Sequence, residues 1–257
     1  MTAFLGNKIC AIPRPGILVS ARSIAESKII VDSGAGWLDL KEPSLGSLGL
    51  PSLELIFAIF ALDIPKTVHV SVAGGELLSW TADLNDLLAA KLPARAYLKL
   101  ALADCRDIEW QKIAEHISLA LVRRSQLILV HYADTAASRS PHWQEVIETT
   151  MALGGKFVLI DTHNKTLGGL LDHYSLAQLE KMIGVAKQFD LGVALAGSLR
   201  LDQLPCLSNL GADWLGVRGA VCRETDRTGD LCLDSLQRAI ALFPAGSSTE
   251  AEHYVVR

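Results

Sequence analysis

The sequence has neither an excess of basic residues nor a long apolar run. Its 257 residues include 24 Lys and Arg against 28 Asp and Glu, which gives a formal net charge of −4. This balance offers little positive charge to neutralise the phosphate backbone of a nucleic acid. The longest apolar run, residues 53–62, contains Glu54 and falls short of the roughly 18 residues that a transmembrane helix needs. The composition therefore argues against a nucleic-acid partner and against a membrane partner.

Several signatures of common binding sites are also missing. The five cysteines include no CxxC pair, which argues against a disulfide framework and a zinc site and predicts reduced thiols in a cytoplasmic protein. The seven histidines show neither HxH nor HExxH spacing. A GxGxxG run after the first strand, a GxxxxGK(S/T) loop and a GxSxG elbow are all absent. We therefore predict no metal, no bound cofactor and no serine-hydrolase chemistry.

Short aliphatic runs alternate with longer helical patterns along the chain, and half of all residues are hydrophobic. Eight such pairs of strand and helix are typical of a TIM barrel. The expected strands are residues 17–20, 37–40, 67–72, 96–100, 127–131, 157–161, 193–196 and 214–217. Helices are expected at residues 52–61, 108–122, 142–153 and 176–189, next to the helix-start residues Pro51, Asp107, Pro141 and Ser175.

No linker or shift in composition divides the chain. We therefore predict one α/β domain, a single TIM (β/α)8 barrel over residues 15–244. Residues 1–14 are expected to be an N-terminal extension, which Pro13 interrupts too early for a signal peptide, and residues 245–257 a polar tail. A doubly wound open sheet is the alternative fold, because periodicity does not reveal whether a sheet closes.

Polar residues gather at the carboxyl ends of the predicted strands. Because side chains alternate along a strand, Asp39 and Lys41 share the inner face with Trp37. The same alternation places Lys99 and Asp161 inside the barrel in two later strands. Active sites of TIM barrels lie at this end, where the loops after the strands converge, so these residues are candidates for catalysis.

Lysines are rarely buried without a partner, so Lys41, Lys99 and Lys165 require an explanation. In one interpretation Lys41 and Lys165 lie on loops and form surface ion pairs with Asp39 and Asp161, worth about 0–1 kcal/mol. If the three amines converge instead, repulsion and burial lower their pKa values and leave a neutral amine near pH 7. Such an amine attacks a carbonyl to form a Schiff base while a second lysine acts as general base, which is aldolase-type chemistry.

The loops after the last two predicted strands have the composition of a phosphate site. Gly197 and Ser198 follow the seventh strand, and Arg218, Gly219 and Ala220 follow the eighth. Loops at these two places bind phosphate in many TIM barrels, through glycine amides, hydroxyls and bidentate arginine contacts. In the alternative interpretation these glycines only form tight turns.

Other reactive side chains have simpler interpretations. His69 and His131 are as compatible with hydrogen-bonded core residues as with an acid or a base. Cys222 is interpreted as a small buried hydrophobic residue rather than a nucleophile.

Seven segments stand out together in chain order. They are VSAR at 19–22, DLKEPSLGSLG at 39–49, YLK at 97–99, YAD at 132–134, DTHNK at 161–165, ALAGSL at 194–199 and GVRGAVC at 216–222. Together they resemble the (5-formylfuran-3-yl)methyl phosphate synthase family, also called 4-(hydroxymethyl)-2-furancarboxaldehyde phosphate synthase. The second and the last segments are the specific ones.

The resemblance implies a TIM-barrel lyase that joins two molecules of glyceraldehyde 3-phosphate, with loss of phosphate and water. The product would serve the biosynthesis of methanofuran-type cofactors in one-carbon metabolism. By the same resemblance, Lys41 matches the Schiff-base lysine and Lys99 the proton acceptor, and Asp39, Asp161 and Lys165 match supporting groups of the active site.

Ser20, in the first segment, joins the candidates for substrate binding. Two departures from the family pattern are the N-terminal extension and His131, which stands where a small residue is expected. A phosphosugar isomerase or epimerase without a Schiff base and a non-catalytic barrel that binds a phosphorylated metabolite are the alternative functions. A phosphorylated triose is the expected partner, and the sequence leaves the formation of a homo-oligomer open.

Overall fold

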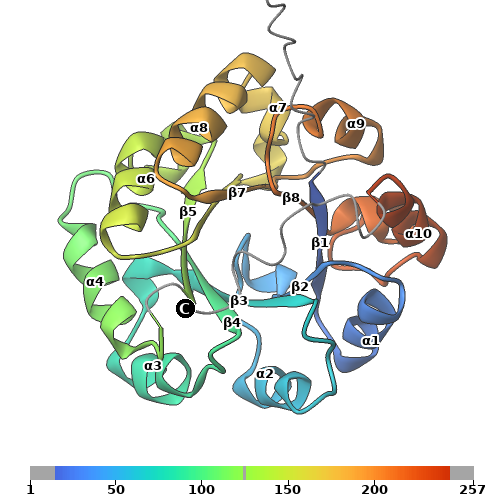
Figure 1. Cartoon of the computed structure of the whole chain (residues 1–257), viewed down its shortest axis with the longest axis horizontal. Coiled ribbons are helices and arrows are strands. Elements are labelled where there is room, and N and C mark those ends of the chain that lie inside the picture. Colours follow the sequence, from blue (N-terminus) through green and yellow to red (C-terminus); the bar gives the residue numbers. More distant parts are fainter. Residues whose placement is uncertain (1–14, 124–125, 244–257) are drawn as a thin grey trace, which may run out of the picture.

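The computed structural model describes residues 15–123 and 126–243. Within them, parallel strands form a closed barrel in sequence order, surrounded by helices (Figure 1). The strands are β1 (Gly16–Ala21), β2 (Trp37–Leu40), β3 (His69–Glu76), β4 (Ala96–Ala101), β5 (Leu127–Tyr132), β6 (Phe157–Asp161), β7 (Gly192–Leu195) and β8 (Trp214–Val217). The first and last strands pair directly, with Leu18 opposite Gly216. The single TIM barrel is thereby confirmed, and the open sheet is wrong.

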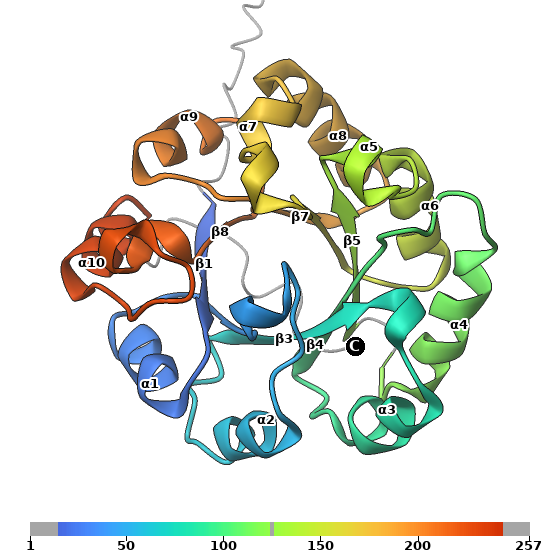
Figure 2. The same ribbon diagram turned by 180° about the vertical axis from the view of Figure 1, so that it is seen from behind.

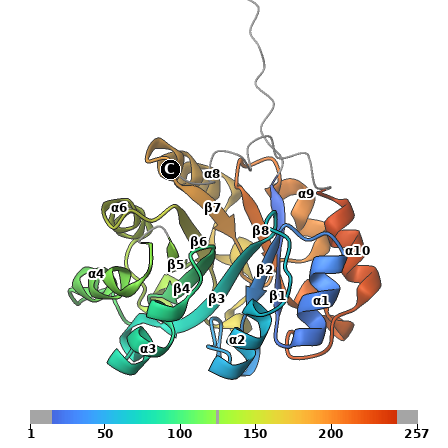
Figure 3. The ribbon, with the colours of Figure 1, turned by 60° about the horizontal axis from the view of Figure 1, so that its bottom comes forward.

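The predicted extension, residues 1–14, and the predicted tail, residues 245–257, lie outside the described residues. The helices lie along the sides of the barrel (Figure 3). They are α1 (Ile24–Asp32), α2 (Leu53–Phe60), α3 (Ala82–Leu87), α4 (Trp110–Ala120), α5 (Thr135–Ser138), α6 (Trp143–Ala152), α7 (Leu170–His173), α8 (Leu176–Gln188), α9 (Leu204–Leu207) and α10 (Leu233–Ala241). In the part of the chain that the structure describes, no helix has the length and apolar character needed to cross a membrane.

The predicted start of a helix agrees with the structure where a side chain caps the first turn of that helix. Ser52 accepts a hydrogen bond from the amide of Leu55 at 3.2 Å, and Ser175 caps α8 in the same way. The helix predicted at 108–122 instead begins at Trp110, two residues later than expected, because the carboxylate of Asp107 binds Arg139 at 2.7 Å rather than capping the helix.

The third strand differs most from its prediction of 67–72. It runs from His69 to Glu76, and its register against β4 shifts between Ala73 and Glu76. Gly75 has a φ of +80°, a conformation that side-chain-bearing residues rarely adopt and that allows the bulge. Gly74 and Gly75 interrupt the alternation of hydrophobic residues, so the alternation does not predict the second half of this strand.

The barrel walls separate two cores, as the alternation of side chains predicts. The outer core lies between the strands and the helices, and all eight strands contribute to it. In β3 and β4 its residues are Val70, Val72, Leu98 and Leu100. A smaller cluster fills the inside of the barrel and includes Leu159 among its inward side chains.

Five rings close the amino end of the barrel, and we call them the aromatic floor: Trp37, His69, Tyr97, Phe157 and Trp214. The centroids of the other four rings lie 5.0–5.2 Å from that of Trp37. A Cβ atom on Gly16 would lie 2.2 Å from the ring of Trp214, so only glycine fits there. Aromatic side chains therefore fill this end of the barrel interior.

Candidate functional site

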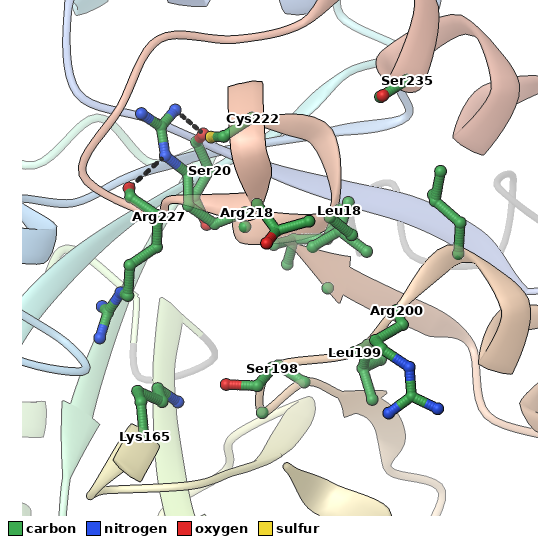
Figure 4. A pocket seen from close by; sticks show the side chains of 18 of the residues that line it. Leu18, Ser20, Lys165, Ser198, Leu199, Arg200, Arg218, Cys222, Arg227 and Ser235 are labelled. Atoms are coloured by element: carbon green, nitrogen blue, oxygen red, sulfur yellow. Dashed lines mark hydrogen bonds between the residues drawn. The ribbon is translucent and has the colours of Figure 1, made fainter. Parts of the chain in front are cut away.

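A pocket of about 770 Å³ opens at the carboxyl end of the barrel, opposite the aromatic floor (Figure 4). The 3₁₀ turn Pro43–Leu45, which follows β2, lies over the mouth of the barrel (Figure 2). Every candidate residue predicted from the sequence lines this pocket: Ser20, Asp39, Lys41, Lys99, Asp161, Lys165, Gly197, Ser198, Arg218, Gly219 and Ala220. The fold thus brings together residues from the ends of β1, β2, β4, β6, β7 and β8.

Asp39 and Lys99 form a buried ion pair with 2.5 Å between Nζ and Oδ1. Both side chains are almost fully covered, at 1% and 4% exposure. The hydroxyls of Ser20 and Ser71 donate to the two carboxylate oxygens of Asp39 at 3.0 and 2.6 Å. Trp37 of the aromatic floor donates its indole N–H to Ser71 at 3.0 Å. These hydrogen bonds fix the position of the Asp39 carboxylate, and with it the ion pair, relative to the aromatic floor.

Asp161 and Lys165 form a second pair, again with 2.5 Å between the charged atoms. The amine of Lys165 also donates to the carbonyl and hydroxyl oxygens of Thr162. Burial acts to raise the pKa of Asp161, but Lys165, Lys41 and the Thr162 amide outweigh it and hold this pKa below its usual value. Burial lowers the pKa of Lys165, against the opposing attraction of Asp161.

Lys41 lies between these two pairs. Its backbone N–H donates to the carbonyl of Ala21 at 3.0 Å, so the residue extends the line of β2 instead of leaving on a loop. Burial lowers the pKa of Lys41 to about 7, aided by the charges of Lys99 and Lys165 and opposed by Asp161 and Asp39. The lysines converge inside the pocket, which contradicts the interpretation of Lys41 and Lys165 as surface ion pairs.

The predicted phosphate loops face the same pocket. Gly197 and Ser198 have φ values of +104° and +50°, and the carbonyl of Gly197 accepts the amide of Leu170 at 2.8 Å. Figure 4 shows the Ser198 hydroxyl pointing into the pocket. Across from it, Gly219 and Ala220 begin a 3₁₀ turn that ends at Val221. Both loops therefore line the same pocket, and the Ser198 hydroxyl is available to an anion there.

Arg218 lines the pocket, but its guanidinium is bound to protein acceptors. It forms a buried ion pair with Glu26 of α1, with distances of 2.7 and 3.0 Å. The remaining N–H groups donate to the carbonyls of Ser20, Arg227 and Gly229. A guanidinium has five N–H donors, and all of them are used in this way. Arg218 therefore shapes the loop after β8. In this structure its guanidinium has no free N–H group for the bidentate phosphate contact that we expected.

Two side chains near the pocket, those of Tyr132 and Arg227, were not among the candidates predicted from the sequence. Tyr132 lies on the inner face of β5 and donates its hydroxyl to Glu76 at 2.7 Å. The alternation of inward residues along β5 contains the signal for it. Arg227 also lines the pocket, and its guanidinium donates to the carbonyl of Gly46 at 2.9 Å. It lies in a run of charged residues, 223–230, in which no pattern distinguishes it.

The two histidines lie away from the pocket. His69 belongs to the aromatic floor, and burial lowers its pKa. His131 faces outward from β5 and contacts the hydroxyl of Tyr174 at 2.9 Å, and burial lowers its pKa to about 4. It is absent from the lining of the pocket, so it does not alter the shape of the pocket directly. Cys222 is buried, as expected. Among residues 15–123 and 126–243, no His, Cys, Asp and Glu side chains are grouped so as to hold a metal ion.

Comparison with known families adds a match over most of the barrel. The model of a family described as 4-HFC-P synthase matches residues 17–240. The (5-formylfuran-3-yl)methyl phosphate synthase of Archaeoglobus fulgidus is 29% identical over 82% of this chain and 92% of its own length. The enzyme of the same name from Methanopyrus kandleri is also 29% identical, over 89% of this chain and 98% of its own.

Solved structures share the fold at lower sequence identity. Phosphoribosyl anthranilate isomerase from Thermus thermophilus superposes with a TM-score of 0.55 over 88% of this chain and 96% of its own. Its sequence identity is 14%, so the similarity concerns the barrel and not its chemistry.

Proposed function

This chain belongs to the 4-HFC-P synthase family, and we propose that it condenses two molecules of glyceraldehyde 3-phosphate into (5-formylfuran-3-yl)methyl phosphate. In this proposal the chain is a lyase, the reaction releases phosphate and water, and it proceeds through a Schiff base on Lys41. The product would enter the synthesis of a methanofuran-type cofactor. The shared name of the relatives supports the product, and the chemistry of the pocket supports the route.

The observation that carries the proposal is the amine of Lys41. With a pKa lowered to about 7, a large fraction of this amine is neutral at neutral pH. Its nitrogen lone pair attacks the aldehyde carbon of the first triose, and loss of water gives a protonated imine. The positive nitrogen withdraws electrons from the neighbouring carbon and so acidifies the proton bound there.

Lys99 is the acceptor of that proton. A lysine accepts a proton only as the neutral amine, and the contact of 2.5 Å between Lys99 Nζ and Asp39 Oδ1 holds this amine in place. Removal of the substrate proton leaves an enamine, whose carbon attacks the aldehyde carbon of the second triose and forms the new carbon–carbon bond, while the aldehyde oxygen takes up a proton and becomes a hydroxyl. Hydrolysis of the imine by water later regenerates the amine of Lys41. The serine hydroxyls on Asp39 keep the pair aligned during these steps.

The charged groups around Lys41 support the phosphorylated substrate. The Asp161–Lys165 pair lies beside the amine, and the loops at Ser198 and Gly219 offer hydrogen bonds to a phosphate group. Binding of phosphate at these loops would place the aldehyde of a triose near the lysines.

Incubation with glyceraldehyde 3-phosphate, followed by mass analysis, tests the proposal. We expect the furan aldehyde phosphate as product and, after borohydride reduction, a triose adduct on the peptide that contains Lys41. Interconversion of triose phosphates without any labelled lysine would instead favour an isomerase.

A further inference from the structure

Arg227 is a pocket cation without a carboxylate partner among the described residues. Two of the three lysines are paired, Lys99 with Asp39 and Lys165 with Asp161. The hydrogen bond recorded for the Arg227 guanidinium joins Nη2 to the carbonyl oxygen of Gly46. That bond uses one of five donors and leaves the charge of the guanidinium without a counter-ion at bonding distance.

The side chain of Arg227 spans the pocket. At its base, Cβ lies 3.9 Å from the position that a Cβ atom on Gly219 would occupy, next to the loop after β8. At its tip, the guanidinium reaches Gly46 in the loop after β2. Figure 4 shows it directed toward Lys165. The tip is therefore separated from the loop after β8 by the length of the side chain.

The electrostatic surroundings of this tip favour an anion. Burial lowers the pKa of Arg227, and this effect reflects the cost of holding a charge away from water. The positive charge of Arg227 also contributes to lowering the pKa of Lys165. An anion placed between these two cations would relieve both costs.

We propose that Arg227 binds the phosphate of the second triose, while the loops at Ser198 and Gly219 hold the phosphate of the first. This inference rests on the proposed function, because the reaction of two triose phosphates brings two phosphate groups into one pocket. A guanidinium suits this task, since its planar fork makes two parallel hydrogen bonds to phosphate oxygens. The nearby lysines place the second aldehyde within reach of the enamine formed on Lys41.

The test separates binding of the first triose from condensation with the second. In Arg227→Ala, borohydride trapping of glyceraldehyde 3-phosphate on Lys41 should stay within about threefold of wild type, because the first triose uses other groups. The kcat/KM for furan product should fall about 10–100-fold, as expected when a hydrogen bond to a charged group is lost. Millimolar guanidinium ion should restore part of this turnover, which a purely structural bond to Gly46 would not allow.

Arg200→Ala is the matched control. Arg200 lines the same pocket, but it pairs with Asp202 at 3.1 Å and its side chain is 63% exposed, so its removal should leave turnover unchanged. Normal turnover in Arg227→Ala, or an equal loss of trapping and turnover, would overturn the inference about Arg227 alone. Absence of furan product from the wild-type chain would overturn the proposed function together with this inference.

Discussion

At the amino end of the barrel β2 contributes the ring of Trp37, and two residues later it contributes the carboxylate of Asp39. The amine of Lys41 follows directly after the end of this strand. In β4, Tyr97 and Lys99 repeat this change. Since a strand rises about 3.3 Å per residue, the apolar floor and the charges are only about 7 Å apart. One end of the interior is packed with rings, and the other carries paired ions around an open pocket.

This contrast provides the burial that lowers the pKa of Lys41. The aromatic floor fills the barrel on one side of the charged layer, and the pocket opens on the other side. The floor also fixes that layer, because Trp37 bonds Ser71 and Ser71 bonds Asp39. We therefore expect substitutions in the floor to affect mainly stability, and substitutions in the charged layer to affect mainly turnover.

The largest effect should come from Lys41→Arg. A guanidinium stays protonated and cannot attack an aldehyde, so turnover should fall by about 10⁴–10⁶-fold, as removal of a covalent nucleophile does elsewhere. The midpoint of urea unfolding should change little, which would sharpen the contrast between the two ends. Borohydride labelling with peptide mapping checks the loss of the adduct. An adduct that persists on Lys165 would assign the nucleophile to that residue instead.

Lys99→Met should lower turnover about 10²–10⁴-fold, the usual cost of losing a general base. The adduct on Lys41 should still form, because imine formation precedes the step that we propose for Lys99. Comparing trapped adduct with product yield measures this difference. Lys112→Met is the control, since Lys112 is an exposed lysine paired with Glu109 on the surface. A parallel loss of adduct and product in Lys99→Met would contradict the assigned role.

Trp37→Ala removes the central ring of the floor and should lower the free energy of unfolding by about 3–5 kcal/mol. Urea denaturation measures the change. Leu119→Ala, at an exposed leucine of α4, should shift the free energy of unfolding by less than about 0.5 kcal/mol. A Trp37→Ala variant that keeps its stability but loses turnover would contradict the expectation that the floor acts mainly on stability and the charged layer mainly on turnover.

The last prediction concerns pH. Because the pKa of Lys41 is lowered to about 7, the rate of adduct formation should rise with pH and level off above that value. The unfolded chain binds more protons than the folded one between pH 7 and 10.5, so the contribution of Lys41 to stability rises with pH through this window. Lys41→Met should lack this slope in urea unfolding. A midpoint of adduct formation near pH 10 would refute the lowered pKa.

The sequence predicts the barrel and the inward residues because both follow from periodicity. Alternation along a strand suffices to place Asp39, Lys41, Lys99 and Asp161 in one pocket. It does not suffice for contacts between distant loops.

The partner of Arg218 is Glu26, 192 residues away, and the partner of Arg227 is the carbonyl of Gly46, 181 residues away. Such contacts depend on loop conformations that no local pattern encodes. The bulge at Gly75 shows the same limit within a strand, because its position depends on the packing of β3 against β4.

The buried ion pair between Arg218 and Glu26 joins a segment near the start of the barrel sequence to one near its end. Glu26 lies in the first helix and Arg218 just after the last strand, so this contact has one of the largest sequence separations in the barrel. Contacts of this kind form late, since the entropy of closing a long loop must be overcome first. We therefore expect the loop at Gly219 to acquire its shape only when β8 pairs with β1. If this loop binds phosphate as proposed, recovery of phosphate binding during refolding would report the closure of the barrel between β8 and β1.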